Sequence, residues 1–154
     1  MQISSILKPE AVRVIGSASS KKRLFQEISD VASTAYGFDA QTAVEALLDR
    51  ESLGPTGVGH GVALPHARLD ELDEICGVFL VLEKPLDFGA VDRQPVDIAF
   101  ALFAPEDAGV EHLKALALVS RTLREQSFCT KLRANHDPAT LYTILTEDHS
   151  VKAA

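Results

Sequence analysis

The sequence predicts one layered domain of the α/β or α+β class, and three observations lead to this fold. Two stretches near the N-terminus have apolar residues at helical spacing. Residues 77–82 and 96–103 are almost continuously apolar, as expected of strands buried on both faces of a sheet. Further helical patterns close the chain, so that helices lead, strands follow and helices return. The 154 residues suffice for a core of ordinary size.

Helix caps, glycines and prolines divide the chain into elements. The first helix can be capped by Ser19 or Ser20 and stopped by Gly37, and the second can be capped by Asp39. Pro105 ends the last apolar run. The expected elements, in order, are a lead-in at 3–7 closed by Lys8-Pro9, a strand at 12–15, helices ending at Gly37 and at Arg50-Glu51, a strand at 62–64, an acidic turn at 70–74, strands at 77–82 and 96–103 joined by an irregular link at 85–95, a helix after Asp107 or Gly109, and helices near 127–134 and 138–145.

Composition and charge exclude several classes of protein. With 46% hydrophobic and 24% charged residues, the chain is expected to fold. A net charge of -7 argues against nucleic acid as a partner, because no basic field would neutralise phosphates. We find no signal peptide and no run long enough for membrane insertion, and Cys76 and Cys129 resemble reduced thiols used for packing. We therefore expect a cytoplasmic protein.

Residues 54–68 hold four glycines, two histidines and an arginine, and the rest of the chain is expected to support them. Pro65 should end the short strand before it, which leaves His66 at a carboxyl end of a strand, where ligands bind in open α/β sheets. A histidine there can bind a metal, act as an acid or base, or accept a group as a nucleophile. It can also be a turn histidine that only bonds a backbone carbonyl.

Two further residues have both a functional and an ordinary interpretation. His112 lies about one turn into a helix, where free N–H groups favour an anion, but it can equally be a partly exposed surface residue. Arg50 can hold a phosphoryl group, or it can be a solvated helix end. His60 could share a metal with His66, although no carboxylate or cysteine completes a familiar ligand spacing.

The familiar cofactor and catalytic motifs are missing. The glycines form neither a P-loop nor a dinucleotide fingerprint, and the sequence has no GxSxG and no HExxH. We therefore expect no nucleotide cofactor and no metal. His136 and His149 lie in the polar C-terminal region and are expected to be exposed.

The sequence Gly-Val-Gly-His-Gly-Val-Ala-Leu-Pro-His at 57–66 resembles the IIA domains of the bacterial phosphoenolpyruvate-dependent phosphotransferase system, of the mannitol/fructose type. Residues 47–51, 94–102 and 112–113 extend the similarity through almost the whole chain, which is most similar to the nitrogen-regulatory branch. The resemblance implies a mixed β-sheet flanked by helices. It also implies a single IIA type-2 domain over 1–154, with its core at about 5–146 and a polar C-terminal tail.

The resemblance implies a role for each candidate residue. His66 occupies the phosphorylated position, His112 matches the family's second active-site histidine, and Arg50 matches its nearby arginine. His60 stands where asparagine is frequent, and Ala67 where glycine is frequent. The leading hypothesis is a phosphocarrier that receives phosphate on His66 from an HPr-like protein and regulates other proteins, such as a kinase, a potassium transporter or a stringent-response enzyme.

The chemistry needs positioning more than additional reactive groups. A neutral imidazole nitrogen can attack an in-line phosphoryl group, while backbone N–H groups of the glycine loop, Arg50 and His112 stabilise its charge. The chain would thus act as a relay component, not as an independent multiple-turnover enzyme. We expect His112 within one hydrogen bond, or one water, of the phosphoryl position. Two alternatives stay open: a permease component that passes phosphate to a IIB domain for fructose or mannitol, and a metal hydrolase using His60, His66 and His112.

Overall fold

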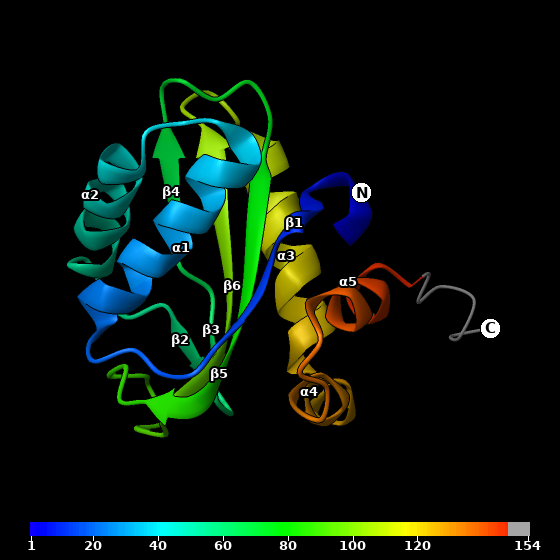
Figure 1. Cartoon of the computed structure of the whole chain (residues 1–154). Helices are drawn as coiled ribbons and strands as arrows, with labels where there is room; N and C mark the ends of the chain where they lie inside the picture. Colours follow the sequence, from blue (N-terminus) through cyan, green and yellow to red (C-terminus); the bar gives the residue numbers. More distant parts are fainter. Residues whose placement is uncertain (148–154) are drawn as a thin grey trace.

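A computed structural model describes residues 1–147 and shows a six-stranded sheet between two layers of helices (Figure 1). Helices α1 and α2 lie on one face of the sheet, and α3, α4 and α5 lie on the other (Figure 1). The elements in order are η1 (Ile3–Ser5), β1 (Leu7–Ile15), α1 (Lys21–Tyr36), α2 (Ala40–Glu51), β2 (Gly57–Gly59), β3 (Val62–Ala63), β4 (His66–Leu69), β5 (Cys76–Leu86), β6 (Val96–Pro105), α3 (Gly109–Arg124), α4 (Gln126–Arg133) and α5 (Pro138–Thr146). The predicted α/β class with a mixed, helix-flanked sheet is confirmed.

The sheet is mixed because strands of both directions pair around β5 and β6. Its order is β1-β5-β6-β3-β2, with β1 parallel and β6 antiparallel to β5. Strands β3 and β4 both run parallel to β6 and follow one another along the same edge of it: Val62 pairs with Ile98, and His66 pairs with Leu102. The interruption between the two strands is residues 64–65. Pairing with β6 resumes after this gap at His66, which is the first residue of β4.

The core forms where the sequence is continuously apolar. Every residue of β6 except the half-buried Asp97 is buried, and β5 is buried from Cys76 to Leu82. Helix α1 packs on this sheet because its apolar residues share one face. Its predicted caps are confirmed: Ser20 Oγ accepts a hydrogen bond from the Arg23 N–H at 3.0 Å, and Gly37 ends the helix with φ 85°.

Two strands are longer than predicted, because prolines do not end them. Strand β1 runs through Pro9, and β5 continues through Pro85 to its end at Leu86. Each proline lies where the pairing register shifts, between residues 7 and 12 in β1 and between 81 and 86 in β5. A proline has no N–H to donate, so irregular or edge positions tolerate it without the loss of a ladder bond.

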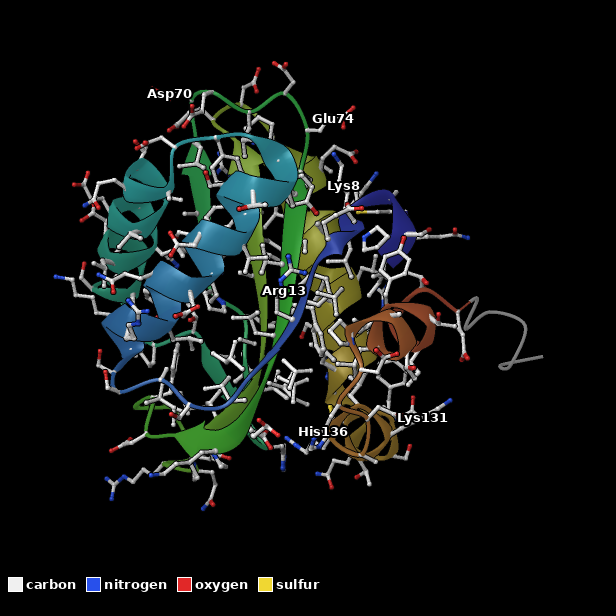
Figure 2. All side chains as sticks on the ribbon, in the orientation of Figure 1. Lys8, Arg13, Asp70, Glu74, Lys131 and His136 are labelled. Carbon is white, nitrogen blue, oxygen red and sulfur yellow. The ribbon has the colours of Figure 1, made fainter. Side chains whose placement is uncertain are left out.

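The loops agree with the expected polarity. Asp70 and Glu74 lie on the connection between β4 and β5, where Figure 2 shows their side chains pointing outward. Cys76 and Cys129 are free and buried, as predicted for packing residues. None of the helices within residues 1–147 is long and apolar enough to cross a membrane. The predicted polar C-terminal tail lies outside the described residues from residue 148 onward, and so does His149.

Candidate functional site

His66 lies at the point where the edge of the sheet resumes. The sequence places it at a strand's carboxyl end, and this is wrong, because it is the first residue of β4. Strand β3 does stop before Pro65, but pairing with β6 starts again one residue later. Since β4 pairs only with β6 among the described strands, His66 stands on an edge that both helix layers can reach.

The hydrogen bonds of His66 define one tautomer. Its Nδ1 lies 2.9 Å from the carbonyl oxygen of Leu64, which can only accept, so Nδ1 carries the proton. Its Nε2 therefore has the lone pair, and it accepts a hydrogen bond from Arg50 Nε at 3.2 Å. Burial lowers the pKa of His66; the bond to Leu64 opposes this, and the charge of Arg50 lowers the pKa further. The imidazole is consequently neutral near pH 7, with a nucleophilic nitrogen at Nε2.

Arg50 is not the solvated helix end that the sequence also allowed. It lies in the last turn of α2, and its side chain is half-buried. Besides the contact with His66, its Nη1 donates to the carbonyl of Gly54 at 3.0 Å. Two hydrogen bonds from one planar group fix its orientation, which places a cation directly beside Nε2 of His66.

His112 approaches His66 from the opposite helix layer. It is the fourth residue of α3, and the two imidazole rings have their centroids 5.7 Å apart with their planes at 75°. The expected closeness of the two histidines is confirmed, but the expected partial exposure is wrong, because His112 is only 5% exposed. Burial, followed by the charges of His66 and Arg68, lowers its pKa to about 4. Its Nε2 is buried and makes no hydrogen bond within residues 1–147.

These side chains line an open depression of about 500 Å³ on the protein surface. Helices α2 and α3 form its walls, and the exposed side chains Leu53 (83%) and Leu113 (65%) lie among its lining residues. A hollow of about 580 Å³ elsewhere is lined by the N-terminus, α3 and α5 and contains neither histidine. The smaller depression is the better candidate, because its lining residues include the neutral imidazole of His66, the cation of Arg50 and His112 with its unpaired nitrogen.

The glycine loop does not line this depression, contrary to prediction. Gly57 and Gly59 belong to β2, and a Cβ atom on Gly57 would lie 2.7 Å from the Cβ of Ala90. Gly61 has φ 80°, and a Cβ there would lie 2.6 Å from Nη2 of Arg133. These glycines allow close packing at the sheet edge instead of presenting N–H groups to His66. The sequence allowed a bond from His66 to a backbone carbonyl, and the structure identifies this carbonyl as that of Leu64, two residues before the histidine.

The three histidines of the metal-site alternative do not come together. The Nδ1 atom of His60 lies 3.2 Å from Nε2 of Gln126, and the backbone N–H of His60 donates to the Asp92 carboxylate. His60 lines a separate hollow of about 210 Å³ that contains neither His66 nor His112. Within residues 1–147, no group of three or more His, Cys, Asp or Glu side chains is arranged to hold a metal ion.

Comparisons with known proteins place this geometry in a family. Residues 5–148 match the family described as "Phosphoenolpyruvate-dependent sugar phosphotransferase system, EIIA 2". The chain is 45% identical to the "Nitrogen regulatory protein" of Bradyrhizobium diazoefficiens over 145 residues, which cover 94% of this chain and 95% of the relative. It is 30% identical to the "PTS system fructose-specific EIIA component" of Haloferax volcanii, over 94% of this chain and 95% of that one. Among solved structures, IIA-Ntr from Neisseria meningitidis matches with a TM-score of 0.87 at 33% identity, over 94% of this chain and 99% of that one.

Proposed function

The chain belongs to the EIIA 2 family of the phosphoenolpyruvate-dependent sugar phosphotransferase system, and we propose that it carries a phosphoryl group on Nε2 of His66. One observation supports this assignment above the others. Burial and the charge of Arg50 keep His66 neutral, and the Leu64 carbonyl holds its proton at Nδ1, so that the lone pair of Nε2 faces Arg50. We propose that residues 1–154 act as one IIA type-2 domain in this relay.

The transfer step follows from the tautomer. The donor is a phosphohistidine on a small HPr-like protein. The Nε2 lone pair of His66 attacks phosphorus, the new N–P bond forms, and the donor's N–P bond breaks with its electron pair returning to the donor imidazole. The donor imidazole carries a proton on its other nitrogen and therefore leaves as a neutral ring. The proton on Nδ1 of His66 stays in its bond to the Leu64 carbonyl, so the phosphorylated His66 ring has a positive charge beside the negative phosphoryl oxygens. No further covalent chemistry is needed, so positioning and charge stabilisation determine the rate.

Arg50 and His112 supply the charge stabilisation in this proposal. Arg50 Nε occupies the Nε2 lone pair in the unphosphorylated protein, so the guanidinium has to turn from this nitrogen to the phosphoryl oxygens. His112 offers a nitrogen without a partner beside the same site. A neutral imidazole can donate one hydrogen bond to a phosphoryl oxygen without adding a charge in the resting state.

The receiving protein defines the two candidate roles. The 45% identical nitrogen regulatory protein favours a regulatory role, in which the phosphorylation state of His66 controls a target such as a kinase, a potassium transporter or a stringent-response enzyme. The 30% identical fructose-specific EIIA component favours transfer to a sugar-specific IIB domain. Offering the purified phosphoprotein to such a IIB domain separates the roles: rapid emptying of His66 supports the permease role, and retention supports regulation.

The labelling experiment tests the assignment directly. Wild type, His66→Ala and, as a matched control, the exposed His136→Ala are incubated with an HPr-like donor whose histidine already carries a labelled phosphoryl group. We expect an acid-labile, base-stable phosphate on wild type and on His136→Ala, and none on His66→Ala. Equal labelling of His66→Ala would overturn the proposal. His112→Ala should keep the label on His66 but exchange it about 100-fold more slowly, the usual result of removing one preorganised donor.

A further inference from the structure

We propose that Glu51 and Thr56 are positioning residues that hold the Leu64 carbonyl in place and thereby fix the tautomer of His66. Neither residue touches the reacting nitrogen. The inference rests on the proposed function, because it concerns the same histidine as nucleophile. It extends the site from the residues that face the depression to a buried chain of hydrogen bonds behind them.

Glu51 is the first residue in this series of hydrogen bonds. Its side chain is only 7% exposed, and its Oε2 accepts hydrogen bonds from Lys21 Nζ at 2.8 Å and from the Thr56 N–H at 3.0 Å. Its Oε1 accepts a third from the Thr56 hydroxyl at 2.6 Å. A buried carboxylate that accepts hydrogen bonds from three donors, one of them cationic, is held in one orientation.

Thr56 connects Glu51 to the backbone at the interruption between β3 and β4. It is 4% exposed, and its carbonyl accepts the N–H of Leu64 at 2.9 Å. The Leu64 carbonyl in turn accepts the Nδ1 proton of His66 at 2.9 Å. At this interruption Leu64 donates its N–H to Thr56 and not to β6, and Pro65 has no N–H. Thr56 therefore holds the backbone of Leu64 on the N-terminal side of the carbonyl that selects the tautomer.

The end of α2 thus controls both nitrogens of His66. Arg50 contacts Nε2 directly, and its neighbour Glu51 acts on Nδ1 through Thr56 and Leu64. The same two residues also restrain the loop at 52–56, since Arg50 bonds the carbonyl of Gly54. If the Leu64 carbonyl turned away, the proton could move to Nε2, and the nucleophilic lone pair would be lost.

Four variants test the inference. Thr56→Val removes the hydroxyl but keeps the shape, and Thr56→Ser restores the hydroxyl. Glu51→Gln keeps the size but replaces one acceptor oxygen with an amide nitrogen. Glu45→Gln, an exposed glutamate on the same helix, is the matched control. Each variant is labelled with ¹⁵N-histidine to read the tautomer of His66 by NMR, and its rate of phosphoryl acceptance is measured against donor concentration.

We expect Thr56→Val and Glu51→Gln to show a mixture of tautomers and to accept phosphate about tenfold more slowly, the effect of one lost charge-assisted hydrogen bond. The half-saturating donor concentration should not change, because neither side chain is available to a docked protein. Thr56→Ser and Glu45→Gln should stay within about twofold of wild type.

Two outcomes would overturn the inference. The first is a wild-type tautomer and rate in folded Thr56→Val and Glu51→Gln. The second is an equal loss in Thr56→Ser and Thr56→Val, which would show that the hydroxyl is not the group that matters. If Glu51→Gln does not fold, the pair at position 56 decides. If wild type itself accepts no phosphate on His66, the proposed function fails, whereas the NMR measurement still tests whether Glu51 and Thr56 select the tautomer.

Discussion

Replacing the buried His112 by glutamine should remove part of the protein's sensitivity to acid. In the folded protein the pKa of His112 is lowered to about 4 from its ordinary value of 6.5, mainly because of burial. The unfolded chain therefore binds a proton on His112 at a higher pH than the folded protein does. Below pH 6.5 this proton favours the unfolded state, so stability falls as the pH drops from about 6.5 to about 4 and changes no further below that.

The size of the effect follows from the two pKa values. Full titration corresponds to about 3 kcal/mol of unfolding free energy, and the part between pH 7 and pH 4.5 is about 2 kcal/mol. Since His112 is only 5% exposed, little of this is lost to solvent screening. His66 contributes in the same direction, because its pKa is also lowered, and this contribution remains in the variant.

Urea unfolding at pH 7 and pH 4.5 measures the effect. Stability should fall between these two conditions by about 2 kcal/mol less in His112→Gln than in wild type, whatever its absolute stability. An identical pH dependence in His112→Gln and wild type would refute the assignment of a buried neutral imidazole at this position.

Three further substitutions give independent tests. Arg50→Lys keeps the charge but loses the planar group that contacts both His66 and the Gly54 carbonyl, so phosphoryl acceptance should slow by about tenfold or more; an unchanged rate in the labelling assay would contradict this. Gly61→Ala forces φ 80° on a residue whose Cβ would meet Arg133, so urea unfolding should show that the free energy of unfolding falls by about 2 kcal/mol. An unchanged free energy of unfolding would argue against that packing. Ser20→Ala removes the N-cap of α1 and should cost about 1 kcal/mol, with Ser20→Thr, a good cap itself, expected near wild type in the same assay.

Local patterns determined much of the secondary structure. The apolar runs in β5 and β6, the caps at Ser20 and Asp39, and the glycine stop at Gly37 could be read from the sequence, because each depends on residues within one or two turns. The predicted start of the first strand at residue 12, after Pro9, and the predicted end of another at residue 82, before Pro85, were wrong because they depend on more than local sequence. Whether a proline ends a strand depends on the register of the neighbouring strand, which is not a local property.

The candidate site also combines features that the sequence indicated with features that only the tertiary structure decided. The sequence indicated His66, Arg50 and His112 as residues suited to phosphoryl chemistry, and their catalytic roles stay predictions. That they meet was decided by the tertiary structure, because the interrupted edge along β6 exposes the start of β4 to α2 on one face and to α3 on the other. The burial of His112, the tautomer of His66 and the exclusion of the glycines from the site also depend on this packing. Distances between residues 50, 66 and 112 are determined by long-range strand pairing and helix packing, and periodicity within one segment carries no information about them.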